Sequence, residues 1–262
     1  MPTLRNRVAL VTGSTSGIGF GIARALALAG ANVMLHGLGD PAETARTREA
    51  LTGETGVRVG LHDADLRQSA EVARLVADTE QQLGVIDILV NNAGVQFVSP
   101  VEEFPPERWL DIQNIVLNAS FLATRAVVPS MKQRGWGRII NLVSAHGLVA
   151  SPFKSAYVAA KHGQIGLTRT VALELAEAGI TCNAICPGYV RTPLVENQIE
   201  AQARTHGLPH DRVIKEVILA AQPTKRFIEV EEIAALALFL CGESARSITG
   251  AALPIDGGWT AR

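Results

Sequence analysis

Short apolar segments alternate with helical patterns about six times along this chain, and this rhythm constrains the fold more than any other feature. The segments are rich in β-branched residues and read as strands buried on both faces, which is typical of a parallel sheet. No long linker and no internal repeat interrupts them. The sequence therefore predicts one α/β domain over residues 1–262, a doubly wound parallel sheet with helices on both faces. The predicted strands are residues 8–12, 32–36, 57–61, 86–90, 138–143, 181–185 and 252–255.

Composition and charge fit such a domain and exclude several classes of partner. The 262 residues are 47% hydrophobic and 19% charged, which is enough to bury a sizeable core. A net charge of −1 without blocks of like charge gives no electrostatic basis for binding nucleic acid or a membrane surface. The chain shows no signal-peptide pattern and no apolar run that could span a membrane. Cys182, Cys186 and Cys241 lack the spacing of a disulfide framework or metal site, so we expect buried thiols, no metal and a cytoplasmic location.

The first predicted strand runs into a glycine-rich loop, GSTSGIG at 13–19, and then into a helical pattern. In this context the glycines let the main chain approach a phosphate, and the helix N-terminus favours its negative charge. The spacing is G-x-x-x-G-x-G, and an ordinary turn between a strand and a helix remains the alternative. After the second strand, Leu38 stands where an acid would bind ribose hydroxyls or an arginine a 2′-phosphate. Because a cation is missing there, the sequence favours NAD over NADP.

Two other strand ends are candidates for ligand binding. Asp65 follows the third strand, where it could accept a hydrogen bond from an adenine amine or cap the next helix. Asn92, Ala93 and Gly94 follow the fourth strand, and such small residues leave room for a ligand at a topological switch point. Residues 194–222 break the strand–helix rhythm with a polar helical pattern. This break predicts a small helical lid at about 190–222, with an ordinary pair of surface helices as the alternative.

Ser144, Tyr157 and Lys161 supply a hydroxyl, a phenol and an amine within one short stretch. Tyr157 and Lys161 are four residues apart in the helical pattern at 154–178, so they share a helix face. An ammonium group beside a phenol lowers the pKa of the phenol, which would let it exchange a proton with a substrate near neutral pH. Ser144 could hydrogen-bond the same substrate oxygen. Taken alone, Tyr-x-x-x-Lys occurs by chance in many chains, and an ordinary surface pair on a helix explains it more often than a catalytic pair does.

Several motifs occur together: TGSTSGIG at 12–19, NNAG at 91–94, Ser144, Y-x-x-x-K at 157–161, PG at 187–188 and a closing DGG. This combination resembles the short-chain dehydrogenase/reductase family over essentially the whole chain. The resemblance implies a Rossmann-type domain that transfers hydride between NAD(P) and an alcohol or carbonyl. In it Tyr157 would be the acid/base, Lys161 would bind ribose and lower the pKa of the tyrosine, and Ser144 would orient the substrate. The implied cofactor-binding residues are Gly13, Thr15, Ser16, Gly17, Ile18, Gly19, Leu38, Asp65, Leu66, Asn92, Ala93, Gly94, Tyr157, Lys161, Pro187, Gly188, Val190 and Thr192.

Longer segments resemble the bacterial (R)-3-hydroxybutyrate dehydrogenases: NAGVQ at 92–96, SAHGLVAS at 144–151, KSAYVAAKHG at 154–163 and the stretch 182–199. In that family a small cluster binds the substrate carboxylate, and one cation with neutral donors suits this task. The resemblance implies NAD-dependent oxidation of (R)-3-hydroxybutyrate to acetoacetate. It also implies a homotetramer in which the tail GGWTAR reaches a neighbouring subunit. The substrate-binding residues would be Gln96, Ser144, His146, Lys154, Tyr157, Tyr189 and Gln198.

The sequence departs from this family at a few positions. Val116 stands where the family has an asparagine whose carbonyl holds a water that relays protons from the lysine, so we expect an altered relay with activity retained. Tyr189 stands in place of a tryptophan and Phe97 in place of a histidine. The smaller ring at 189 predicts a broader preference for chain length. Two alternatives stay open, namely another 3-hydroxy or 3-oxo acid as substrate, or a catalytically weak nucleotide sensor.

Overall fold

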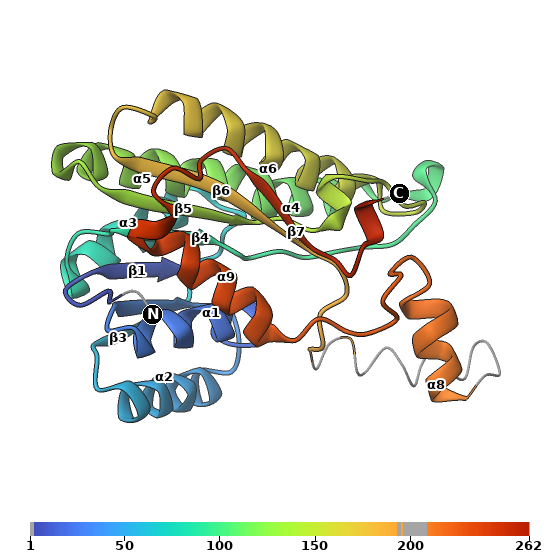
Figure 1. The fold of residues 1–262 in the computed structure, drawn as a ribbon, viewed down its shortest axis with the longest axis horizontal. Coiled ribbons are helices and arrows are strands. Elements are labelled where there is room, and N and C mark those ends of the chain that lie inside the picture. Colours follow the sequence, from blue (N-terminus) through green and yellow to red (C-terminus); the bar gives the residue numbers. More distant parts are fainter. Residues whose placement is uncertain (1–2, 193–194, 196–208, 262) are drawn as a thin grey trace.

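A computed structural model describes residues 3–192, 195 and 209–261 (Figure 1). Within this part of the chain all seven strands form one parallel sheet in the order β3-β2-β1-β4-β5-β6-β7. This confirms the predicted doubly wound sheet. The strands are β1 (Val8–Val11), β2 (Asn32–His36), β3 (Val59–His62), β4 (Ile88–Asn91), β5 (Gly137–Leu142), β6 (Ile180–Pro187) and β7 (Ala252–Ile255).

Helices cover both faces of the sheet, and successive strand residues point to opposite faces. Ala9 and Val11 of β1 belong to the core under α1 and α9, whereas Val8 and Leu10 belong to the core under α3 and α5. One layer consists of α1 (Gly17–Leu28), α2 (Pro41–Thr55) and α9 (Val230–Cys241), and the other contains α3 (Ser69–Leu83), α4 (Pro106–Ile112), α5 (Ala119–Arg134) and α6 (Ser155–Glu174) (Figure 1).

The strand order reverses direction between β1 and β4, which makes this the topological switch point. Val11 at the end of β1 pairs with Val90 of β4, so the loops that follow these two strands leave the sheet side by side. Ligands of doubly wound sheets bind outside the carboxyl ends of the strands at such a point. The fold therefore brings the glycine-rich loop next to Asn92, Ala93 and Gly94.

The helical stretch between β4 and β5 contains a change of pitch. The chain is helical from Pro106 to Arg134, but Gln113–Asn118 forms a π-helical segment between α4 and α5. Such segments widen the helix by one residue per turn and are common at functional sites. Val116 lies inside it, so the backbone distortion is present although the family's asparagine is absent. Ordinary apolar periodicity carries no signal for this change of pitch.

The other described strands and helices begin and end close to the predicted residues. The third strand begins at Val59 in place of residue 57. Of the expected lid, the structure describes α8 (His210–Arg212) and a π-helical segment, Val213–Ile218, while residues 193–194 and 196–208 lie outside the described part. The three cysteines are free and buried, as their spacing indicated. Among the described helices, none combines the length and apolar character that crossing a bilayer would require.

Candidate active site

The glycine-rich loop after β1 is shaped for the close approach of a ligand to the main chain. Gly13 and Gly17 have φ angles of +62° and +56°, a region that side chains with a Cβ rarely adopt. At Gly19 a Cβ atom would lie 2.3 Å from the carbonyl oxygen of Gly13. Ser16 precedes α1 without forming a side-chain cap, so the first N–H groups of the helix remain available to an anion.

His36, at the end of β2, holds this loop in place. The main-chain N–H of Gly13 donates to Nδ1 of His36 at 3.0 Å, so the ring proton is on Nε2, which bonds the carbonyl of Ala64 at 2.9 Å. Burial lowers the pKa of His36, which keeps the ring neutral and Nδ1 free to accept. Sequence reasoning missed this residue, because its role depends on contacts between three strand ends.

The residues after β4 are tied to the same loop. The side-chain amide of Asn92 donates to the carbonyls of Thr12 and Gly13, both at 2.8 Å. The hydroxyl oxygen of Thr12 accepts from the main-chain N–H groups of Asn92 and Ala93, both at 3.0 Å. A Cβ on Gly17 would lie 3.8 Å from Thr192, so the strand end at β6 also approaches the loop. The structure thus brings these predicted cofactor residues together.

Asp40 and Asp65, the acids near the ends of β2 and β3, form hydrogen bonds with groups of the protein itself. Asp40 caps α2 by accepting from the N–H of Glu43 at 2.9 Å. Asp65 accepts from the guanidinium of Arg67, and these hydrogen bonds lower the pKa of Asp65 to about 2. Gln68 occupies the N-cap position of α3 without a capping hydrogen bond from its side chain, and Asp65 accepts from the N–H of Arg67 outside the helix, so the capping alternative for Asp65 is wrong. Leu38 is 63% exposed, whereas Leu66 is buried.

Ser144, Tyr157 and Lys161 meet beyond the end of β5. The two α6 residues are one turn apart, and Nζ of Lys161 lies 5.6 Å from the centre of the Tyr157 ring. The side chain of Ser144 hydrogen-bonds the Tyr157 hydroxyl. Lys161 is only 2% exposed, and Ser144 and Tyr157 are half-buried, so the surface-pair alternative is wrong.

The electrostatics of this trio differ from the expectation in one respect. Burial raises the pKa of Tyr157 to about 12, against a smaller lowering by the hydrogen bond from Ser144. Burial also lowers the pKa of Lys161 to about 7. The expected lowering of the tyrosine pKa by the ammonium is therefore not found in the protein alone, where loss of solvent outweighs the attraction between the charged forms. The lysine is instead poised between its neutral and charged forms near pH 7.

His146 forms the back of the predicted substrate region. It is 5% exposed, and its ring nitrogens face the hydroxyls of Ser144, at 3.4 Å, and Ser151, at 2.9 Å. Burial, together with the charge of Lys154, lowers the pKa of His146 to about 4. The imidazole is therefore neutral at physiological pH, and the fixed positive charge of the region resides on Lys154.

The structure describes Lys154 and Gln96 among the other predicted substrate residues. Lys154 occupies the N-cap position of α6, and the loop carrying Gln96 is tied to the preceding residue by the N–H of Ser99, which donates to the carbonyl of Phe153 at 2.9 Å. Gln96 itself is exposed and Lys154 is half-buried. Gln198 lies outside the described residues.

Trp259 is a residue of this region that sequence reasoning assigned elsewhere. Its ring packs edge-on against His146, with centroids 5.0 Å apart, and stacks on Tyr189 at 5.6 Å. The tail expected to reach a neighbouring subunit thus places its tryptophan over the site of its own chain. Asp256 holds the tail in this position by accepting from the N–H groups of Gly258 and Thr260.

The residues at and after the end of β6 form the last part of the site. Pro187 is the last strand residue, and Val190, buried, forms an isolated bridge with Ile228. A Cβ on Gly188 would lie 2.5 Å from Oε1 of Gln222, which accepts from the N–H of Tyr189 at 3.0 Å. Gln222 is fully buried and so fixes the direction in which Tyr189 leaves the strand.

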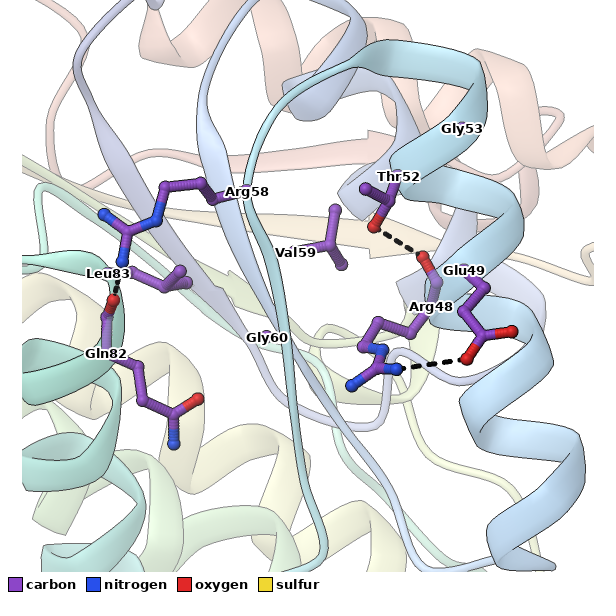
Figure 2. A pocket seen from close by; sticks show the side chains of 9 residues that line it. All are labelled: Arg48, Glu49, Thr52, Gly53, Arg58, Val59, Gly60, Gln82 and Leu83. Atoms are coloured by element: carbon purple, nitrogen blue, oxygen red, sulfur yellow. Dashed lines mark hydrogen bonds and ion pairs between the residues drawn. The ribbon is translucent and has the colours of Figure 1, made fainter.

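A separate hollow lies between α2, the beginning of β3 and the end of α3 (Figure 2). Several of its polar groups already have partners: Arg48 pairs with Glu49 at 3.2 Å, and Arg58 donates to the carbonyl of Gln82. It adjoins the outermost strand of the sheet and contains none of the predicted site residues. The chemistry of this chain is therefore concentrated at the carboxyl ends of the central strands.

Comparisons with known proteins agree with this geometry. Residues 13–260 match a family model described as enoyl-(acyl carrier protein) reductase. The chain is 56% identical to a D-beta-hydroxybutyrate dehydrogenase of Rhizobium meliloti, over 98% of this chain and 99% of that protein. It is 52% identical to a D-beta-hydroxybutyrate dehydrogenase of Cupriavidus necator, over 99% and 100%. The L-sorbose reductase of Gluconobacter frateurii, solved with NADPH and L-sorbose, superposes with a TM-score of 0.94 at 30% identity, over 99% and 98%.

Proposed function

Because the chain belongs to the short-chain dehydrogenase/reductase family, we propose that it is an NAD-dependent dehydrogenase that interconverts (R)-3-hydroxybutyrate and acetoacetate. The observation that carries the proposal is the meeting of two sets of residues at one place. Ser144, Tyr157 and Lys161 can oxidise an alcohol, and His146 with Lys154 beside them can bind a carboxylate. A small 3-hydroxy acid has both groups within a few bonds of each other.

The cofactor site fits a dinucleotide. Gly13, Gly17 and Gly19 leave the main chain open to a pyrophosphate at the N-terminus of α1. Bound there, a nicotinamide cofactor would supply the acceptor for the hydride. Neither the loop 13–19 nor residues 37–45 contain an arginine or lysine that could pair with a 2′-phosphate. This supports NAD over NADP.

The chain's own groups would handle the proton and the charge. Tyr157 takes the proton of the substrate hydroxyl, and Ser144 hydrogen-bonds the same oxygen as its negative charge develops. The ammonium of Lys161, close to the tyrosine ring, favours the phenolate form of Tyr157. Lys154 binds the carboxylate with a charge-assisted hydrogen bond, and neutral His146 donates one ring N–H. Gln96 and Gln198 would complete the carboxylate site.

The test follows the appearance of NADH by its absorbance, with (R)-3-hydroxybutyrate and NAD. The S enantiomer and NADP serve as the parallel substrates. We expect turnover with the R form and NAD, and a loss of roughly 10²–10⁴-fold in the rate of Tyr157→Phe, the typical contribution of an acid/base group. NADH binding by the variant, measured by fluorescence, should remain.

Two results would decide against the proposal. Saturable NAD binding without turnover of either enantiomer would favour another hydroxy acid or a nucleotide sensor. Full activity of Tyr157→Phe would remove the tyrosine from the mechanism. The expected homotetramer and cytoplasmic location rest on the resemblance, and light scattering of the purified protein tests the assembly directly.

A further inference from the structure

A buried line of side chains leads away from the amine of Lys161. Nζ of Lys161 donates to the carbonyl of Leu142 at 2.7 Å and to Oε1 of Gln164 at 2.9 Å. Nε2 of Gln164 donates to the hydroxyl oxygen of Ser120 on α5 at 2.8 Å. Ser120 in turn donates to the carbonyl of Val116, in the π-helical segment, at 2.7 Å. Gln164 and Ser120 are 0% and 4% exposed.

The direction of every hydrogen bond in this line is fixed by the chemistry of its ends. An ammonium group has donors only, so it must face the oxygen of the Gln164 amide. The amide nitrogen then faces Ser120, whose single proton goes to Val116. Gln164 therefore presents an acceptor to the lysine and has no freedom to rotate by 180°.

We propose that Gln164 is a positioning residue of the active site: supported by Ser120 and the carbonyl of Val116, its side-chain oxygen holds the amine of Lys161 in place and keeps it charged beside Tyr157. We name the three residues Gln164, Ser120 and Val116 the lysine support. The proposal rests on the proposed function for the part played by Lys161. The line does not conduct protons, since an amide would have to pass through an unfavourable tautomer; it orients and stabilises a cation.

The surroundings of Lys161 explain why it needs such a support. Among the described residues, the titratable groups facing its amine are Tyr157 on the same helix and Cys186 on β6. Neither carries a charge in its protonated form, and burial disfavours the ammonium. From β5 only the carbonyl of Leu142 reaches the amine, which leaves Gln164 as the second acceptor. A hydrogen bond to a charged group is worth more than one between neutral groups.

The lysine support also shows how this chain functions with valine at position 116. The side chain of Val116 is fully buried in an apolar cluster with Ile112, Ala156 and Ala160, and its carbonyl accepts from Ser120. The polar part of position 116 is therefore its main chain. A serine commonly bonds the carbonyl four residues before it in a helix, so this contact does not depend on the side chain at 116.

The first test measures the pKa of Lys161 without substrate or cofactor. The chain has five lysines, so ¹³C labelling at their ε-carbons gives few NMR signals, and Lys161→Met identifies the relevant one. We expect Gln164→Met, which removes the acceptor at similar length, to lower this pKa by about one pH unit. Gln164→Glu should raise it, because a carboxylate attracts the ammonium. A purely structural role would not produce opposite signs.

Thr168→Val is the matched control. Thr168 lies one turn further along α6 and is 1% exposed. Its hydroxyl donates to the main-chain carbonyl of Gln164 at 2.7 Å and accepts from Asn141 at 2.8 Å, and among the described residues it forms no hydrogen bond with Lys161. Its loss disturbs the packing of α6 to a similar degree, yet the pKa of Lys161 should stay at the wild-type value. An unchanged pKa in Gln164→Met would overturn the proposal.

The second test uses kinetics. In Gln164→Met we expect kcat to fall about tenfold, since part of a charge-assisted hydrogen bond is lost, with KM for the hydroxy acid nearly unchanged. The alkaline limb of the pH profile of kcat should move to lower pH, because the lysine loses its proton earlier. Ser120→Ala should give a smaller change in the same direction. An inactive wild type would refute the proposed function, whereas the NMR result decides on the lysine support in either case.

Discussion

The two halves of the candidate active site are built in different ways. Around β1 and β4 the loops offer main-chain groups, and the side chains of His36, Asn92 and Thr12 serve to hold those loops in shape. Around β5 and β6 the side chains themselves face the reaction, and burial shifts the pKa values of Tyr157 and Lys161. We call these the loop half and the side-chain half. The loop half thus depends on free space around its main chain, and the side-chain half depends on the charge states of its side chains.

We expect the largest effect from a substitution in the loop half. In Gly19→Ala the new Cβ would lie 2.3 Å from the carbonyl oxygen of Gly13 and 2.4 Å from the amide of Asn92, so the loop must move. We expect NADH affinity, measured by fluorescence titration, to fall by about 100-fold, since overpacking costs roughly 1–3 kcal/mol and the phosphate donors shift with it.

The control for this change is Gly53→Ala in α2. No atom lies within 4 Å of a Cβ at Gly53, which is far from the loop. The control should bind NADH as the wild type does and be more stable by about 0.5–1 kcal/mol, because alanine favours the helix. Equal affinity of Gly19→Ala and wild type would show that the loop is not limited by space.

The second prediction concerns the charge of the side-chain half. The pKa of His146 is lowered from the ordinary 6.5 to about 4 in the folded protein. Its contribution to stability is therefore fully present above pH 6.5 and is lost as the pH falls from 6.5 towards 4, because the unfolded chain takes up the proton first. Between pH 7 and 4.5 the wild type should lose about 2–3 kcal/mol of unfolding free energy through this residue.

Urea unfolding at the two pH values measures this loss. His146→Gln lacks the titrating group and should lose correspondingly less stability on acidification. The exposed His210 on α8 provides the control, since it is not among the groups that lower the pKa of His146 and His210→Gln likewise removes one imidazole. If His146→Gln and wild type lose the same stability, His146 is not kept neutral by burial.

The sequence alone reveals part of the fold and part of the candidate site. The spacing of apolar residues and the turn residues predicted the sheet and its switch point. A strand that is buried on both faces is apolar along its whole length, and this can be recognised in a short stretch of sequence. Ser144, Tyr157 and Lys161 stood out by their reactive groups and spacing, but their roles were assigned from the family resemblance. His36, Gln164 and Trp259 could not be found, since each acts through partners far along the chain. The π-helical segment at 113–118 was also missed, because it changes the helix pitch without changing which residues are apolar.

The third prediction concerns the shape of the substrate pocket in the side-chain half. Tyr189 stacks on Trp259, which in turn covers His146. The smaller ring should admit 3-hydroxypentanoate, and Tyr189→Trp should shift the ratio of kcat/KM towards 3-hydroxybutyrate by about tenfold, within the range of one methylene. Parallel NADH assays with the two acids measure this ratio. Poorer or equal turnover of the five-carbon acid by the wild type would contradict the idea of a wider pocket.

The smallest effect is expected at Val116, the place where the side-chain half uses a main-chain group. Val116→Asn introduces the amide expected from the family resemblance, but the carbonyl already accepts from Ser120 and the π-helical segment is already formed. We expect kcat to change by a few-fold at most, with a slight shift of the pH profile, and stability to fall by about 1 kcal/mol or more because an amide enters an apolar cluster. Initial rates across pH and urea unfolding measure the two quantities. An unchanged rate and pH profile would show that valine does not alter the relay, whereas a change of 100-fold would mean that the lysine support does not replace what the asparagine provides.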